Sequence, residues 1–144
     1  MMLRCGLALL LFAAATGARA DDAAPSLGAR LAGNTVNGVL FAPRGTLPRG
    51  GGELERLVFQ AFLRPDGTAL VREWDTRHDA YAATVAGHWR VEADTLCLDL
   101  PQPGVVGATC IEVHVWGPRI AGNGTGRFVM LDGDIAPGNA LTAP

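Results

Sequence analysis

The sequence predicts an all-β fold, a small antiparallel β-barrel or sandwich with one short helix near its N-terminus. Three observations predict it. From residue 53 onward, short runs of alternating apolar and polar residues follow one another along the chain. Clusters of glycine, proline, aspartate and asparagine separate these runs at regular intervals, as turns do. No long amphipathic helical pattern appears after residue 20. Short strands at regular spacing are typical of antiparallel barrels and sandwiches.

Residues 1–20 have the layout of a secretory signal peptide. Arg4 gives a positive start, an apolar run follows, and Ala18 and Ala20 are the small residues that favour cleavage after Ala20. The apolar run is too short to cross a bilayer of roughly 30 Å as a helix, so we expect no stable membrane anchor. Residues 21–144 are then one domain, which is periplasmic or secreted.

Charge excludes two classes of partner. The chain has 12 arginines, no lysine and 14 acidic residues. Cleavage after Ala20 removes Arg4 and Arg19, which leaves 10 basic residues against 14 acidic ones and a net charge of −4. An acidic domain is not attracted to nucleic acid or to an anionic membrane surface, so we expect neither as a partner.

The cysteines predict one disulfide bond. Cys5 precedes the apolar run, whereas a lipidated cysteine would lie at the cleavage site, so we do not expect a lipoprotein. Cys97 and Cys110 are the two cysteines of the mature chain, and such a pair in an exported domain predicts a disulfide. A metal-binding or redox pair is the alternative, although redox motifs usually place their cysteines two residues apart.

The domain is predicted to begin with the helix. Ser26 is a favourable N-cap, the apolar spacing of residues 27–31 suits a short helix, and Gly33 ends it. Residues 35–41 alternate as a first strand. The stretch 42–52 is rich in proline and glycine and predicts a long loop.

Seven further strands follow. Pro65-Asp66-Gly67 predicts a turn between strands at 57–63 and 68–74, because proline presets its φ and glycine accepts a positive φ. Gly122-Asn123-Gly124 and Asp132-Gly133-Asp134 are also predicted as turns. The remaining strands are expected at residues 81–85, 87–92, 95–100, 109–116 and 127–131.

Alternation in the strand at 109–116 predicts which face is buried. Cys110, Glu112, His114 and Trp116 share one face, and the β-branched residues between them share the other. We expect the β-branched face to lie in the core. The disulfide would then fix the register of a hairpin from its outer side.

Metal and cofactor chemistry are not expected. His78, His88 and His114 are not placed at metal-ligand spacings, so the sequence predicts no metal and no cofactor. The alternative is a copper or zinc site formed by His78 and His88 with either Asp75 or Asp79. That site requires the intervening turn to fold back over the following strand.

The sequence also predicts that the protein is not an enzyme. The mature chain has a single serine, which lies outside any nucleophile-elbow motif. The carboxylate pairs Glu73/Asp75 and Asp132/Asp134 suit a solvated strand face and a turn better than acid–base catalysis. An activity that depends on the first pair or on His78 stays as a third hypothesis.

Trp74, Tyr81 and Trp89 are the candidate ligand-binding residues. They lie on neighbouring predicted strands, where aromatic rings with a polar group would line the mouth of a barrel and offer a large contact area. Core packing is the alternative for each of these side chains.

Several short motifs occur in a familiar order: Gly33-Asn34-Thr35, Pro65-Asp66-Gly67-Thr68, Gly87-His88-Trp89, and Leu96-Cys97 with the later Cys110. In these the chain resembles a group of small exported proteobacterial proteins with Gly-Asn-Thr, Gly-x-Trp and Leu-Cys…Cys motifs. Those proteins are similar to lipocalin-like β-barrels. The resemblance implies a fold and an exported location, and it implies no activity.

A fainter similarity is to bacterial periplasmic protease-inhibitor barrels. Gly87-His88-Trp89, Trp116-Gly117-Pro118 and Asp132-Gly133 match the order of their motifs, while the cysteine spacing differs. In such inhibitors an exposed N-terminal segment blocks the protease.

Two functions are therefore predicted. The first is an exported, non-enzymatic module that binds a small apolar or amphipathic ligand near Trp74, Tyr81 and Trp89. The alternative is an interaction protein, such as an inhibitor of an exported hydrolase, whose contact is Asp21–Ser26 or the loop at 42–52. The expected partner is accordingly a small molecule or an exported protein.

Overall fold

The computed structural model describes residues 24–43, 54–99, 108–124 and 129–142. The predicted signal peptide, most of the loop predicted at 42–52 and the loop predicted at 101–107 lie outside the described residues.

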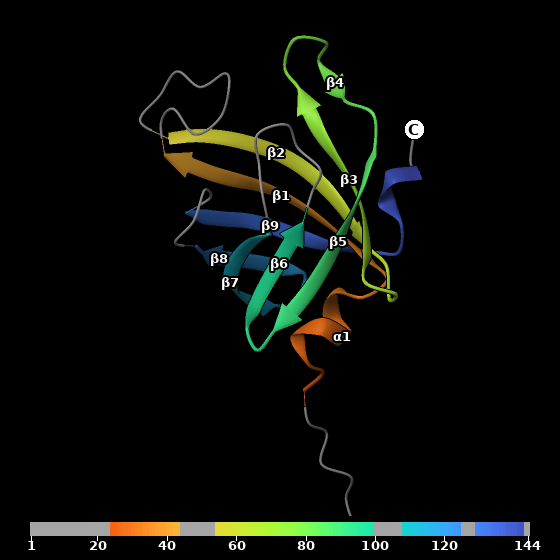
Figure 1. Ribbon diagram of the computed structural model, residues 1–144, viewed down its shortest axis with the longest axis vertical. Helices are drawn as coiled ribbons and strands as arrows, with labels where there is room; N and C mark the ends of the chain where they lie inside the picture. The colour runs from red at the N-terminus through yellow and green to blue at the C-terminus, as the bar shows by residue number, and fades with distance from the viewer. Residues whose placement is uncertain (1–23, 44–53, 100–107, 125–128, 143–144) are drawn as a thin grey trace, which may run out of the picture.

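The described chain folds as a closed antiparallel β-barrel of eight strands, which confirms the predicted fold class (Figure 1). Each barrel strand pairs with its neighbours in the sequence, and the first and last strands pair to close the ring. The elements are α1 (Leu27–Leu31), β1 (Asn34–Pro43), β2 (Leu54–Leu63), β3 (Thr68–Asp75), β4 (Ala80–Tyr81), β5 (Val85–Glu92), β6 (Thr95–Asp99), β7 (Thr109–Trp116), β8 (Arg119–Asn123), β9 (Met130–Pro137) and a final 3₁₀ turn (Ala140–Thr142). The short β4 pairs only with the end of β3 and is not part of the ring.

The predicted helix closes one end of the barrel. The Ser26 hydroxyl accepts a hydrogen bond from the Ala29 amide at 3.3 Å, as expected of an N-cap. Leu31 is fully buried in the core. Arg30 donates from Nη1 to the Val115 carbonyl and from Nη2 to the Gly117 carbonyl, each at 2.9 Å, which ties α1 to the β7–β8 turn.

The β2–β3 turn forms as the sequence predicts. Gly67 has a φ of +84°, which a residue with a side chain rarely adopts. Asp66 Oδ1 accepts from the Thr68 amide at 2.9 Å and from its hydroxyl at 2.6 Å. These two bonds stabilise the carboxylate and hold the pKa of Asp66 below its ordinary value.

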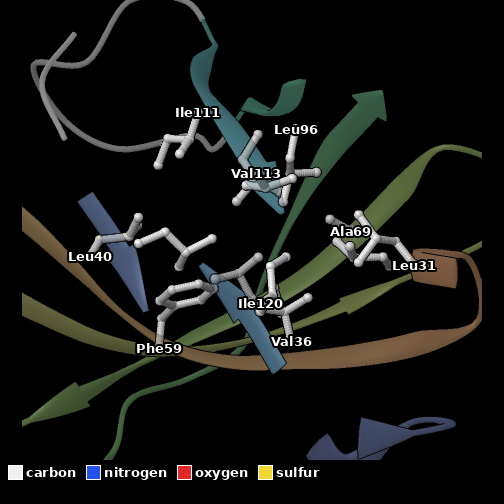
Figure 2. Close-up of a cluster of buried hydrophobic side chains, with 14 of the residues drawn as sticks. Leu31, Val36, Leu40, Phe59, Ala69, Leu96, Ile111, Val113 and Ile120 are labelled. Atoms are coloured by element: carbon white, nitrogen blue, oxygen red, sulfur yellow. The ribbon is translucent and has the colours of Figure 1, made fainter. Parts of the chain in front are cut away.

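Apolar side chains from α1 and from the strands fill the barrel interior. Figure 2 shows side chains of several strands and of the helix meeting there. Close packing of this kind is usual in barrels of about eight strands, whose interior is just wide enough for side chains. The buried hydrophobic cluster consists of Leu31, Val36, Leu40, Ala42, Phe59, Ala61, Leu63, Ala69, Val71, Leu96, Leu98, Ile111, Val113, Ile120 and Leu131.

Two predicted turns are instead strand interiors. Gly122 lies within β8 and Gly133 within β9. A Cβ on Gly122 would collide with the Glu112 carbonyl oxygen, and one on Gly133 with the Asn37 carbonyl oxygen. Both positions therefore need glycine because another strand comes too close, and the turn prediction was wrong there. As a result β8 was missed, and the last strand lies later than predicted.

The disulfide prediction is confirmed. Cys97 and Cys110 are directly opposite each other on β6 and β7, and their sulfur atoms are bonded. Ile111 and Val113 are buried on the opposite face of β7, whereas Cys110 is exposed. The bridge therefore joins the two strands from outside the barrel, on the face that the alternation predicts.

Candidate functional site

Trp74 and Tyr81 form an aromatic pair where β3 leaves the barrel wall. The pairing of β2 with β3 ends at Phe59 and Glu73, and beyond this point Trp74 pairs with Tyr81 of β4. The Trp74 and Tyr81 rings meet edge to face, with their centroids 5.1 Å apart. Because β3 turns toward β4, it separates from the first half of β2, and Figure 1 shows the β3–β4 hairpin projecting from the barrel.

A groove lies along this separation. It is lined by Arg56, Leu57 and Val58 from β2, and by Trp74 and Thr76 from the end of β3 and its turn. Its volume is about 290 Å³. Leu57 packs against the core cluster, so the apolar side chains on the outer face of the groove are those of Val58 and Trp74, beside Arg56 and Thr76. This composition suits a small molecule with an apolar body and a polar group.

A turn braced by side chains connects β3 to β4. The two carboxylate oxygens of Asp75 have different partners: Oδ1 accepts from the Arg77 amide at 2.8 Å, and Oδ2 lies 2.7 Å from His78 Nδ1. The His78 contact and then the Arg77 amide hold the pKa of Asp75 below its ordinary value. The turn ends at Asp79, which has a φ of 51°. These contacts fix the hairpin that carries Trp74.

A chain of hydrogen bonds crosses four strands on the outer face beside the groove. Asn37 Nδ2 donates to Asp134 Oδ2 at 3.1 Å, Gln60 Nε2 donates to Asn37 Oδ1 at 2.8 Å, and Arg72 Nε donates to Gln60 Oε1 at 2.7 Å. An ionised carboxylate only accepts, so Asp134 sets the orientation of both amides. The chain ends on Arg72, whose guanidinium carbon lies 4.6 Å from the centre of the Tyr81 ring.

The third predicted aromatic residue lies elsewhere. Trp89 of β5 is half-buried and packs against the core cluster, and its indole Nε1 donates to the Arg64 carbonyl at 2.7 Å. Arg64 precedes the β2–β3 turn, so Trp89 lies at the opposite end of β3 from Trp74. The structure thus brings Trp74 and Tyr81 together and places Trp89 at the other end of the barrel.

The candidate metal ligands are also apart. His78 contacts Asp75 at the end of β3, whereas His88 on β5 pairs with Thr68 at its start. His114 is exposed on the outer face of β7. Within the described ranges, no three histidine, cysteine, aspartate or glutamate side chains gather closely enough to hold a metal ion.

The candidate acid–base pairs differ in their surroundings. Glu73 is opposite the core residue Phe59 and is half-buried. Asp132 and Asp134 are exposed on β9, where Asp132 Oδ1 accepts from Arg119 Nη2 at 2.5 Å. Asp132 and Asp134 therefore lie within a strand, where their carboxylates contact side chains of neighbouring strands on the barrel surface, and they are not in a turn.

Sequence reasoning missed every candidate ligand-binding residue of this region except Trp74 and Tyr81, including the polar side chains of Arg56, Gln60 and Arg72. The signal for Arg72 was its place two residues before Trp74, which puts both on one strand face. Arg56 and Gln60 carry no such local signal.

No helix in the described part of the chain is long and apolar enough to cross a membrane.

Comparison with models of known protein families, with curated proteins and with solved structures found no match to this chain.

Proposed function

We propose that this protein is an exported, non-enzymatic binding module that holds a small amphipathic molecule in the groove beside Trp74. The observation that carries the proposal is a groove on the outer wall of a barrel whose interior is packed with side chains. A ligand in the interior would have to displace buried core residues. A ligand in the groove displaces only solvent and covers apolar surface.

The size of the groove supports a small ligand. A volume of about 290 Å³ is near the lower end of the range of known ligand pockets, about 300–1,000 Å³. Val58 and Trp74 offer apolar contacts, while Arg56 and Thr76 offer donors for a polar group. One short alkyl chain or one aromatic ring with a polar head matches this lining.

The groove is held in place before any ligand arrives. Trp74 is fixed by backbone pairing with Tyr81 and by the edge-to-face contact of their rings. Asp75 and its two partners brace the turn that follows. A preformed site loses less conformational entropy on binding, which favours affinity.

The proposal predicts that Trp74→Ala weakens ligand binding. With octyl glucoside as the probe, isothermal titration calorimetry is expected to show a loss of affinity of about tenfold or more, equivalent to about 1.4 kcal/mol, because a buried aromatic contact is removed. Circular dichroism of the same variant reports whether the barrel is intact.

Trp116→Ala is the matched control. Trp116 is 54% exposed on β7 and lines no part of the groove, so its loss is expected to leave affinity unchanged. Equal affinity of wild-type protein and folded Trp74→Ala would show that the ligand binds elsewhere.

The eight-stranded barrel with one disulfide agrees with the lipocalin-like architecture that the resemblance implies. The alternative, inhibition of an exported hydrolase, would use Asp21–Ser26 or the loop at 42–52 as its contact, and residues 21–23 and 44–52 of these segments lie outside the described residues. Deletion of Asp21–Ser26 separates the two, because it would abolish inhibition and leave binding in the groove intact.

A further inference from the structure

We infer that the groove selects anionic amphiphiles, whose apolar chain lies on Val58 and Trp74 while the single negative group is held at one end by Arg56 or at the other by Arg72. This inference rests on the proposed function and adds the charge of the ligand to it. The proposed ligand is a free molecule with one alkyl chain and one carboxylate, such as a fatty acid anion. A groove of about 290 Å³ fits one such chain.

Arg56 is a cation in the groove that has no anionic partner among the described residues. It is exposed on β2, lines the groove, and makes no hydrogen bond or ion pair with any other residue in the described part of the chain. A guanidinium offers five N–H donors in a planar fork that matches a carboxylate. Arg56 is therefore available to a ligand anion.

Arg72 is a second cation, held ready beside the aromatic pair. Its Nε donates to Gln60, and its guanidinium lies over the Tyr81 ring. No hydrogen bond from its two Nη groups is found within the described residues. The hydrogen-bond chain that begins at Asp134 therefore orients a guanidinium whose outer donors remain available. Orientation in advance reduces the entropy lost when an anion binds.

The acidic groups on the same surface already have partners. Asp75 contacts His78 and the Arg77 amide, and Asp134 accepts from Asn37. Asp132 is paired with Arg119. Among the described residues neither Arg56 nor Arg72 forms an ion pair, so each guanidinium is available to a negative ligand although the whole protein is acidic.

The register of the strands places the apolar contact between the two cations. Val58 and Trp74 are the residues one step beyond the last β2–β3 pair. Arg56 lies two residues before Val58, and Arg72 two residues before Trp74, on the same strand faces. A chain lying over Val58 and Trp74 thus has a guanidinium near each end.

The test compares three probes that share one alkyl chain: octanoate, octyl glucoside and octyltrimethylammonium, each below its micelle-forming concentration. Calorimetry of the wild-type protein is expected to show octanoate binding about tenfold more tightly than octyl glucoside, because a charge-assisted hydrogen bond is added. Octyltrimethylammonium is expected to bind most weakly. Higher ionic strength should reduce the advantage of octanoate.

Variants assign the preference to the two arginines. Arg56→Gln and Arg72→Gln are each expected to reduce the advantage of octanoate over octyl glucoside, and the double variant is expected to bind octanoate no more tightly than octyl glucoside. Arg90→Gln removes the same charge from β5, where Arg90 is paired with Glu92, and is expected to leave the preference unchanged.

Four outcomes would overturn the inference. Equal binding of all three probes, or an octanoate preference that survives in the double variant, would refute charge selection and leave the proposed function standing. No binding of any probe would refute both. Cosedimentation with vesicles containing phosphatidylglycerol without binding of free octanoate would also overturn it, because the anion would then belong to a lipid surface.

Discussion

Replacing Gly133 with alanine is expected to destabilise the protein by about 3 kcal/mol or more, at the upper end of overpacking substitutions. The added Cβ would collide with the Asn37 carbonyl oxygen and lie 2.9 Å from the Gly38 Cα. Both neighbours are backbone atoms of β1, which closes the barrel by pairing with β9. The strands must therefore move apart at the seam between the first and last strand. Chemical denaturation followed by circular dichroism measures the loss.

Two other glycines serve as controls for this prediction. A Cβ at Gly28 in α1 meets nothing within 4 Å, so Gly28→Ala is expected to be neutral or to stabilise by up to about 1 kcal/mol. A Cβ at Gly38 would lie 3.1 Å from the Phe59 side chain, so Gly38→Ala is expected to destabilise the protein by less than Gly133→Ala does. Equal stabilities of the Gly28 and Gly133 variants would contradict the close approach of β1 and β9.

Loss of the disulfide is expected to lower the free energy of unfolding by about 2–4 kcal/mol without changing the fold. Cys97 and Cys110 are separated by 13 residues, and loop-closure entropy predicts about 3 kcal/mol for a loop of that length. Cys97→Ser removes the bridge, and urea denaturation of the oxidised wild-type protein and the variant gives the difference.

Reduction of the wild-type protein is the matched experiment, because it breaks the same bond without a substitution. It should lower stability by a similar amount. Free thiols in protein purified from an oxidising compartment would contradict the presence of the disulfide and would favour a redox or metal-binding role for Cys97 and Cys110.

Much of the fold could be predicted from local sequence. The Ser26 cap, the Pro65-Asp66-Gly67 turn and the alternation around Ile111 each depend on a few adjacent residues, and each is confirmed. Gly122 and Gly133 show where prediction from local sequence fails. A glycine that permits a turn and a glycine that permits close strand approach look the same in sequence. Only the pairing of distant strands distinguishes them.

The site could be predicted less completely for the same reason. Trp74 and Tyr81 come together because β4 folds back on β3 locally. The sequence predicts Trp89 in the same site, yet its indole Nε1 donates a hydrogen bond to the Arg64 carbonyl at the opposite end of β3. Arg72 and Gln60 are joined by the β2–β3 register. Such partners are set by tertiary pairing, which no short motif specifies.

The most direct test of the central claim is to map where octanoate binds by nuclear magnetic resonance of the isotope-labelled protein. We predict shifts confined to residues 56–58 and 72–76, with the Trp74 indole proton moving and that of Trp116 unmoved. Shifts centred on interior residues such as Val113 and Ile120 would instead place the ligand inside the barrel and contradict an outer-wall site.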